Sequence, residues 1–252
     1  YSVNAAWGDD PTTFFTDTFL QVVPGDTFSW APAWAVMIPL ALVWVLVLFV
    51  IGRGLSKGVE AANKVFLPLL VILFLALVVR ALFLPGAVEG LNAFFTPNWS
   101  ALADPKVWLA AFAQIFYSLS VGFGIMLTYA SYLKRKSNLT GTALVAGFAN
   151  SSFEILAGIG VFSAVGFMAH QGGVSVSEVE GLTGPILSFV TFPKIISMMP
   201  GGPIFGVLFF SSLVLAGVTS LLSLLQVVSG GLQDKFGWSP ARSALVLGVP
   251  AT

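Results

Sequence analysis

Oxygen-bearing side chains and glycines interrupt an apolar stretch of the sequence that should form a membrane helix. Ser118, Ser120, Gly122 and Gly124 lie near its middle, and none of them is a strong helix former. An unwound segment exposes backbone N–H and C=O groups, which is tolerated at membrane depth where the backbone lines a cavity. Half-helix ends and freed carbonyls of this kind can hold ions and charged substrates. A kinked packing face made of small residues is the alternative that this stretch leaves open.

A second apolar stretch contains an ionisable residue. Glu154 lies deep inside it, and Asn150 precedes Glu154 by four residues, so both side chains lie on one helix face. An ionisable residue within a membrane span is a functional candidate by default. The alternative is a carboxyl that burial keeps protonated and that makes only a structural hydrogen bond.

A third stretch carries a compact group of oxygen atoms. Ala216, Thr219 and Ser220 are spaced i, i+3 and i+4, which places them on one face of a helix. Hydroxyls at such positions often bond to carbonyls of their own helix, and this alternative stays open. Three such features on three helices nevertheless favour a site for a hard cation, which prefers oxygen ligands, and so predict a transporter.

The composition requires these residues to be positioned by membrane helices. The chain of 252 residues is 57% hydrophobic and 9% charged, with a mean hydropathy of +0.94. Long apolar runs imply helical spans, because helices satisfy their own backbone groups in lipid. A net charge of zero gives no reason to expect a nucleic-acid partner, the absence of cysteine excludes disulfides and thiolate metal sites, and one histidine leaves little for transition-metal chemistry.

Five apolar runs have the length of a membrane span, namely 33–51, 65–84, 107–133, 139–169 and 203–232. Their connecting segments fall into two groups. One group holds eight basic residues: Arg53, Lys57, Lys64, Lys134, Arg135, Lys136, Lys235 and Arg242. The other holds three: Arg80, Lys106 and Lys194. The positive-inside rule therefore places the first group in the cytoplasm and predicts a multi-pass protein of the inner (plasma) membrane.

The outer segment 171–202 is too long for a simple turn. Its part "GPILSFVTFPKIISMMPGG" is too short, and too rich in proline and glycine, to span a bilayer. We predict a hairpin of short helices that dips toward the outer mouth, with Pro193 disrupting it. An interfacial loop that lies on the protein surface is the alternative.

The sequence resembles the neurotransmitter:sodium symporter family, in particular its prokaryotic amino-acid transporters such as the bacterial leucine transporter. The resemblance rests on "RGLSKGVEAANKVFLP", "AQIFYSLSVGFGIMLTYASY", "ANSSFEILAG" and "AGVTSLLSLLQ", and it runs from about Gly8 to the end. It implies an all-α polytopic membrane protein, a fragment of a twelve-helix inverted-repeat fold with a discontinuous helix. The implied parts are the tail of helix three and an outer segment (1–32), helices four and five (33–84), an outer loop (85–106), broken helix six (107–136), helix seven (138–170), the outer hairpin (171–202), helix eight (203–236) and the start of helix nine (240–252).

The same resemblance assigns residues to two Na⁺ sites, each incomplete without the first helices of the family fold. Ser118 and Asn150 match side-chain ligands of the first site, where the carboxylate of the amino-acid substrate completes the shell. The carbonyl of Ala216 and the hydroxyls of Thr219 and Ser220 match the second site.

Substrate and gating residues follow from the resemblance as well. The residues that match the substrate pocket are Tyr117, Ser118, Ser120, Phe123, Ser220 and Leu224, with Tyr117 as the aromatic lid. Tyr132 and Asp234 match the cytoplasmic gate. Gly58 and Pro68, separated by nine residues, match a motif that permits unwinding, although an ordinary helix start and kink would look the same. Tyr1 is left out of the site, because acidic residues and Pro11 follow it too closely.

Glu154 stands where chloride-dependent members of the family have serine, so the resemblance implies charge balance by this carboxylate in place of chloride, and possible proton counter-transport. The resulting prediction is a sodium-coupled symporter of a neutral, apolar amino acid that works by alternating access and needs no chloride. A transporter-like sensor without turnover has the same binding sites and remains an alternative. An intramembrane enzyme is disfavoured, because His170 stands alone near an outer helix end and Glu154 has no partner acid nearby.

Overall fold

The protein is built from helices, four of which are long and apolar enough to cross a bilayer. The computed structural model describes residues 4–8, 10–22, 32–179 and 184–251, and all regular elements in these segments are helical. The long helices are α2 (Trp34–Gly52), α3 (Ala61–Leu82), α7 (Leu139–Gly172) and α10 (Gly202–Phe236). The π-helical turn η3 (Leu55–Glu60) directly precedes α3. The predicted all-α membrane architecture is confirmed.

Shorter helices connect and cover these four. They are α1 (Pro11–Thr13), η2 (Phe14–Phe19), η3 (Leu55–Glu60), α4 (Ala87–Phe95), η4 (Trp99–Ala103), α5 (Pro105–Ser118), α6 (Ile125–Ser131), η5 (Val176–Glu178), α8 (Gly184–Ile186), η6 (Leu187–Thr191), α9 (Phe192–Met198) and α11 (Pro240–Ala251).

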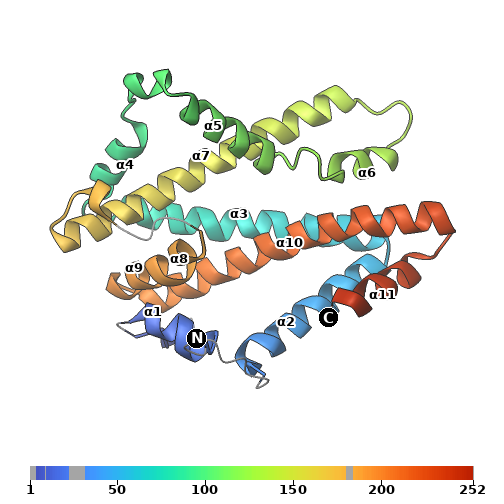
Figure 1. The fold of residues 1–252 in the computed structure, drawn as a ribbon, viewed down its shortest axis with the longest axis horizontal. Coiled ribbons are helices and arrows are strands. Elements are labelled where there is room, and N and C mark those ends of the chain that lie inside the picture. Colours follow the sequence, from blue (N-terminus) through green and yellow to red (C-terminus); the bar gives the residue numbers. More distant parts are fainter. Residues whose placement is uncertain (1–3, 9, 23–31, 180–183, 252) are drawn as a thin grey trace.

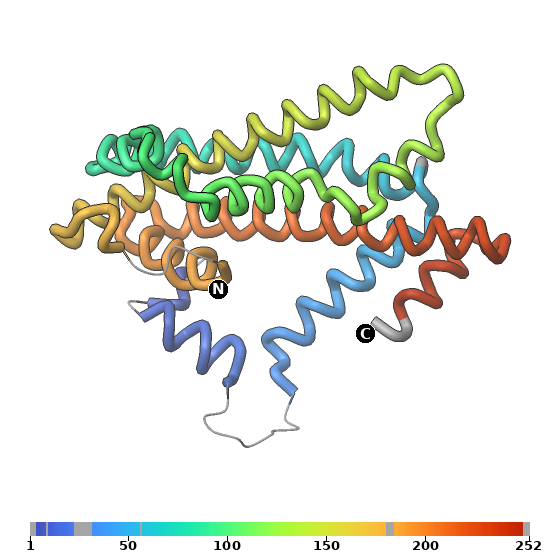
Figure 2. Tube along the Cα trace, turned by 45° about the horizontal axis from the view of Figure 1, so that its top comes forward, coloured from blue at the N-terminus to red at the C-terminus, as the bar shows by residue number. Residues whose placement is uncertain are grey.

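Helices α3 and α10 pack side by side and form the centre of the molecule (Figure 1). Helix α7 packs on α3, and α2 packs on α10 together with α11. Buried side chains of α2, η3, α10 and α11 form one apolar core, which includes Ile51, Val59, Leu222 and Ala244. Helix α6 lies against α10, and the chain turns back from α6 into α7 (Figure 2).

The predicted break in the third apolar run is confirmed. The run forms two helices, α5 of 14 residues and α6 of 7 residues, and each alone is too short to span a bilayer. Between them, Ser120, Gly122 and Gly124 have positive φ values of 52°, 87° and 77°. Glycine adopts such a conformation without steric cost. Ser120 is one of few non-glycine residues with a positive φ in the described segments. The predicted weakness of this helix is therefore a real interruption, with a left-handed residue at every second position.

The outer segment differs from the prediction at Pro193. Residues Gly184 to Met198 form one continuous helical segment from α8 through η6 to α9, and Pro193 lies in the first turn of α9. The physical reason is the wide turn before it, where the backbone N–H of Phe192 donates to the carbonyl of Leu187, five residues back. A π turn gives room for a proline ring that would otherwise clash with the preceding turn. Pro193 therefore does not disrupt the helix, contrary to the prediction.

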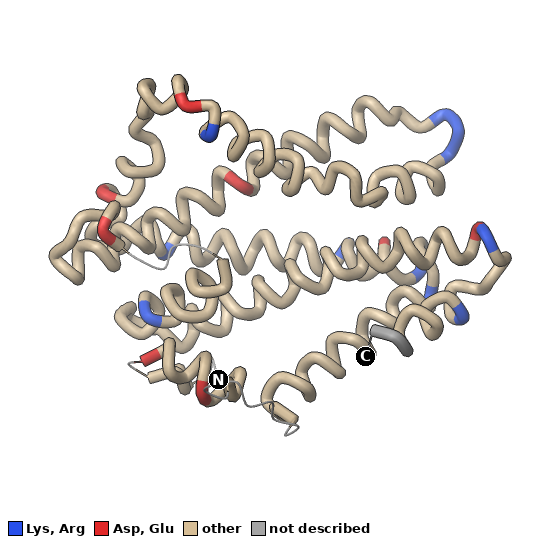
Figure 3. Tube along the Cα trace, in the orientation of Figure 1, with Lys and Arg blue, Asp and Glu red and all other residues tan. Residues whose placement is uncertain are grey.

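Basic residues gather at one end of the bundle (Figure 3). The turn between α6 and α7 carries Lys134, Arg135 and Lys136, and the junction of α10 with α11 carries Lys235 and Arg242. The junction of α2 with η3 lies at the same end. We call this the basic end of the molecule.

Candidate functional site

The broken helix and α7 bring Ser118, Asn150 and Glu154 together. The side-chain nitrogen Nδ2 of Asn150 donates to Glu154 Oε1 at 3.1 Å and to Ser118 Oγ at 3.3 Å. Asn150 and Glu154 lie one turn apart on α7, as the sequence predicted, whereas Ser118 is the last residue of α5. We call these three residues the first cluster.

The hydrogen bonds of the first cluster leave oxygen atoms available. The side-chain amide of Asn150 has two N–H groups, and it donates one to Glu154 and one to Ser118. A carboxylate only accepts hydrogen bonds, so the amide nitrogen, and not the amide oxygen, points toward Glu154. The amide oxygen Oδ1 has no hydrogen-bond partner among the described residues. Glu154 also forms no ion pair with any residue in the described segments. An uncompensated carboxylate and a free amide oxygen, both half-buried in an apolar helix, suit a monovalent cation.

Ala216, Thr219 and Ser220 lie within one turn of α10. Thr219 is 8% exposed, and its hydroxyl donates to the carbonyls of Leu215 and Ala216, both at 3.0 Å. The back-bond considered as an alternative from the sequence is therefore present. It does not exclude ion binding, because a hydroxyl that donates its proton still has lone pairs for a cation. We call these three residues the second cluster.

The side chains expected around a substrate do not enclose a pocket among the described residues. Tyr117, Phe123 and Leu224 expose 74%, 47% and 42% of their surface. Ser220 is exposed and Ser120 is half-buried within the break. These residues come from α5, the break and α10, and they do not close a pocket in the described part of the chain.

The expected gating residues lie toward the basic end. Tyr132 and Asp234 are exposed and share no hydrogen bond in the described part of the chain. Gly58 is buried in the π turn η3, where a Cβ atom would come too close to the carbonyl oxygen of Val50. Only glycine fits at this backbone contact. The chain is π-helical here, directly before α3, at the place where the resemblance predicts unwinding. Pro68 is exposed inside α3.

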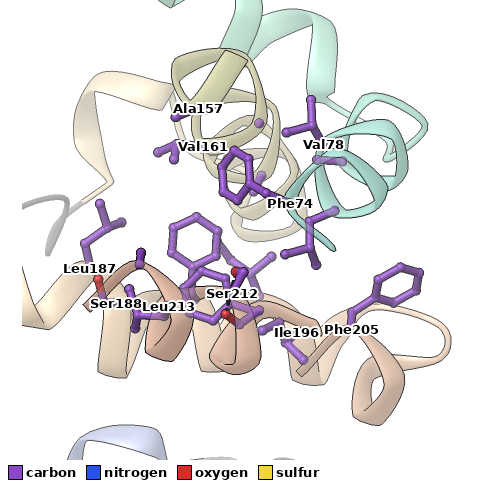
Figure 4. Close-up of a pocket in the computed structure, with 18 of the residues that line it drawn as sticks. Phe74, Val78, Ala157, Val161, Leu187, Ser188, Ile196, Phe205, Ser212 and Leu213 are labelled. Atoms are coloured by element: carbon purple, nitrogen blue, oxygen red, sulfur yellow. Dashed lines mark hydrogen bonds between the residues drawn. The ribbon is translucent and has the colours of Figure 1, made fainter. Parts of the chain in front are cut away.

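An apolar cavity of about 300 Å³ lies between α3, α7, α9 and α10 (Figure 4). Phe74, Val78, Val161, Ile196 and Leu213 are among its lining residues. Its polar lining groups include Ser212, whose hydroxyl is already bonded to the carbonyl of Phe209. Ala216 lines the cavity as well, so the second cluster lies beside it. The lining is mainly hydrocarbon and does not suit an ion, and no pattern in the sequence predicted this cavity.

Comparison with known proteins decides the class. The sequence model of the "Sodium:neurotransmitter symporter family" matches residues 2–251. The chain belongs to this family. The symporter family consists of sodium-dependent transporters, which are a class distinct from enzymes.

Individual members of the symporter family agree with this assignment. The sodium-dependent transporter MJ1319 of Methanocaldococcus jannaschii is 39% identical over 241 residues, which are 94% of this chain and 48% of MJ1319. The sodium- and chloride-dependent creatine transporter 1 of Bos taurus is 35% identical over 222 residues, 88% of this chain and 34% of that protein. The structure of MhsT in complex with L-phenylalanine superposes with a TM-score of 0.72 at 36% identity, covering 99% of this chain and 56% of MhsT. The chain thus spans about half the length of MJ1319 and of MhsT.

One polar contact was not predicted. The hydroxyl of Tyr129 on α6 donates to Ser223 Oγ on α10 at 2.9 Å. Ser223 follows Thr219 by four residues, so the helical spacing that grouped the second cluster could have included it. Its partner Tyr129 could not be found in that way, because the two residues are 94 positions apart.

Proposed function

We propose that the protein is a sodium-coupled symporter of a neutral, apolar amino acid that works by alternating access. The observation that carries this proposal is the first cluster: an unpaired carboxylate and a free amide oxygen meet the last residue of a helix that is broken at membrane depth. Such an end can hold a sodium ion together with the carboxylate of a substrate. The membership in a family of sodium-dependent transporters supports the same role.

The proposed roles of the residues follow the two clusters. Ser118 and Asn150 hold one Na⁺ through oxygen atoms, and Ala216, Thr219 and Ser220 hold a second. Tyr117, Ser120, Phe123 and Leu224, with Ser118 and Ser220, contact the substrate. Tyr132 and Asp234 close the basic end, and Gly58 and Pro68 permit η3 and the first turns of α3 to unwind.

The substrate class rests on the absence of charge around these positions. Apart from Glu154, which serves the ion, the expected contacts are aromatic, aliphatic or hydroxyl groups, so an ionic side chain would lack a partner. MhsT, which was crystallised with L-phenylalanine, supports a hydrophobic amino acid. The orientation of the basic end toward the cytoplasm of a plasma membrane is part of the proposal.

Glu154 supplies the negative charge that balances sodium, so we propose that transport needs no chloride. The creatine transporter, which is named as sodium- and chloride-dependent, is a relative that depends on chloride.

The test is amino-acid uptake by the full-length protein in proteoliposomes. We expect saturable accumulation of a hydrophobic amino acid that requires an inward sodium gradient and is unchanged when gluconate replaces chloride. Sodium-dependent binding without accumulation would indicate a sensor instead, and accumulation without sodium would refute the proposal.

A further inference from the structure

Helix α4 packs on α7 through glycines that bring the two backbones into direct contact. A Cβ atom on Gly90 would overlap the carbonyl oxygen of Phe162. A Cβ atom on Gly166 would in the same way overlap the carbonyl oxygen of Gly86. A backbone carbonyl cannot turn aside as the end of a side chain can, so a side chain at either glycine would push the two helices apart. The position of α4 on α7 is therefore fixed by these contacts.

An aromatic side chain completes the contact between α4 and α7. The ring of Phe94 stacks on that of Phe162 with the centroids 4.9 Å apart, and it also lies against Gly158 of α7. Gly90 and Phe94 are four residues apart, so they share one face of α4. Gly90 is buried on this face, whereas Glu89 is exposed. One face of α4 is thus committed to α7.

The joint between α4 and α5 is braced by side chains. The helix η4 follows α4 after residues 96–98, and α5 begins directly after Asp104. Asp104 caps α5, because its carboxylate accepts from the backbone N–H of Lys106 at 2.9 Å. The indole N–H of Trp108, in the first turn of α5, donates back to the carbonyl of Leu102 in η4 at 2.8 Å. The direction in which α5 leaves η4 is therefore held at the joint.

Helix α5 has little other support in the part of the chain that the structure describes. Residues 105–117 are all exposed there. Ser118, the last residue of α5, is half-buried and accepts the hydrogen bond from Asn150 of α7. Figure 1 shows the chain leaving α7 after α4 and returning to it at the end of α5. The described contacts thus locate α5 by its two ends, the joint with η4 and the bond to α7.

We propose that Gly90 is a positioning residue for the first cluster. The backbone contact at Gly90 fixes α4 on α7, the braced joint carries this position into α5, and α5 brings Ser118 to Asn150. A displaced α4 would move the whole end of α5, its backbone carbonyls included, away from Asn150. The inference rests on the proposed function, because it explains how the first sodium site is held together from a distant helix.

The test compares glycine-to-alanine variants within helices of the full-length protein. Gly90→Ala should raise the sodium concentration for half-maximal binding of radiolabelled L-phenylalanine about three- to fivefold, the effect of one weakened polar contact to the ion. Gly158→Ala would meet only the end of the Phe94 ring, which can move, so its shift should be smaller. Maximal binding should stay unchanged in both variants.

Two further glycines of α7 serve as matched controls. Gly147 has open space around it in the described part of the chain, so Gly147→Ala should change nothing. A Cβ atom on Gly160 would lie 2.8 Å from Val78 Cγ2 of α3. Gly160→Ala therefore disturbs the packing of α7 on α3 and should lower the melting temperature in detergent without changing the sodium dependence. A shift in sodium dependence by Gly160→Ala as large as that by Gly90→Ala would overturn the proposal.

A merely structural role of Gly90 predicts a different result. Gly90→Ala would then lower the melting temperature and leave the sodium dependence unchanged, which would also overturn the proposal. If Gly90→Ala does not fold, Trp108→Phe takes its place, because it removes one N–H group at a position that is 60% exposed. We expect a shift of about twofold for Trp108→Phe, and none for Trp99→Phe, at a 74% exposed position of η4. An unchanged sodium dependence of Trp108→Phe would in that case overturn the proposal.

A double-mutant cycle connects the effect to one cluster. Gly90→Ala and Ser118→Ala act on the same contact, so their combined shift should be smaller than the product of the two single shifts. Gly90→Ala and Thr219→Val act on different clusters and should give the full product. A full product in both pairs would overturn the proposal. Absence of sodium-dependent binding by the parent protein would instead refute the proposed function.

Discussion

The two clusters on α7 and α10 present oxygen atoms in different ways. The first joins α5 and α7, and its members bond to one another through side chains, with Asn150 at the centre. The second lies within one turn of α10, and the hydroxyl of Thr219 is bonded to carbonyls of its own helix. The first cluster thus depends on where two helices meet, while the second is preformed by local structure.

This difference indicates how each cluster responds to motion. Displacement of α5 relative to α7 would separate Ser118 from Asn150 and dismantle the first cluster. The second cluster keeps its own geometry whatever its neighbours do, so access to it must be controlled from outside. The carboxylate also belongs to the first cluster alone, which makes charge balance its distinctive feature.

The largest expected effect comes from the carboxylate. Glu154→Ser should reduce uptake in chloride-free medium at least about tenfold, because the loss of a charge beside a bound cation costs a few kcal/mol. Chloride should restore uptake. Measuring uptake with chloride and with gluconate checks this, and Glu89→Ser, at an exposed position on α4, should leave both rates unchanged.

Unchanged chloride-free uptake by Glu154→Ser would remove the main distinction between the clusters. The carboxyl would then have a structural role, as considered from the sequence.

The next effect concerns the preformed cluster. Thr219→Val keeps the shape and removes the hydroxyl, so the half-saturating sodium concentration should rise by about an order of magnitude, typical of a lost contact to a charged group. The melting temperature in detergent should change little, because Leu215 and Ala216 keep their helical hydrogen bonds. Thr219→Ser retains the hydroxyl and should behave like the parent. A large loss of stability with normal sodium dependence would show that Thr219 serves only its helix.

The smallest effect is expected for Ser118. Its hydroxyl lies 3.3 Å from Asn150 Nδ2 and 3.4 Å from the carbonyl oxygen of Ile115, both long for hydrogen bonds. Ser118→Ala should therefore raise the half-saturating sodium concentration only about two- to threefold. The matched control is Ser151→Ala, at an exposed position beside Asn150 on α7. If the two variants are indistinguishable, Ser118 does not belong to the ion site.

Local patterns in the sequence predicted much of the fold. Apolar runs indicated α2 and α10 because membrane spans are read from composition. Small and polar residues indicated the break, and the spacing of four residues placed Asn150 and Glu154 together. The prediction was wrong at Pro193, because the width of the preceding turn is a property of the folded backbone that composition does not reveal.

Contacts between distant residues could not be predicted from these patterns. Ser118 and Asn150 are 32 positions apart, and only the family resemblance assigned them to one site. Tyr129 and Ser223 are 94 positions apart, and nothing in the sequence paired them. Such pairs depend on how far one helix slides along another, which the period of a single helix does not determine.

The most direct test of the account is a structure of the full-length protein in which thallium(I), a heavy monovalent substitute, replaces sodium. We predict two anomalous peaks, one beside Asn150 Oδ1 and Ser118 Oγ and the other beside the Ala216 carbonyl and the hydroxyls of Thr219 and Ser220. A structure that shows bound amino acid but no monovalent ion at either cluster would contradict the account.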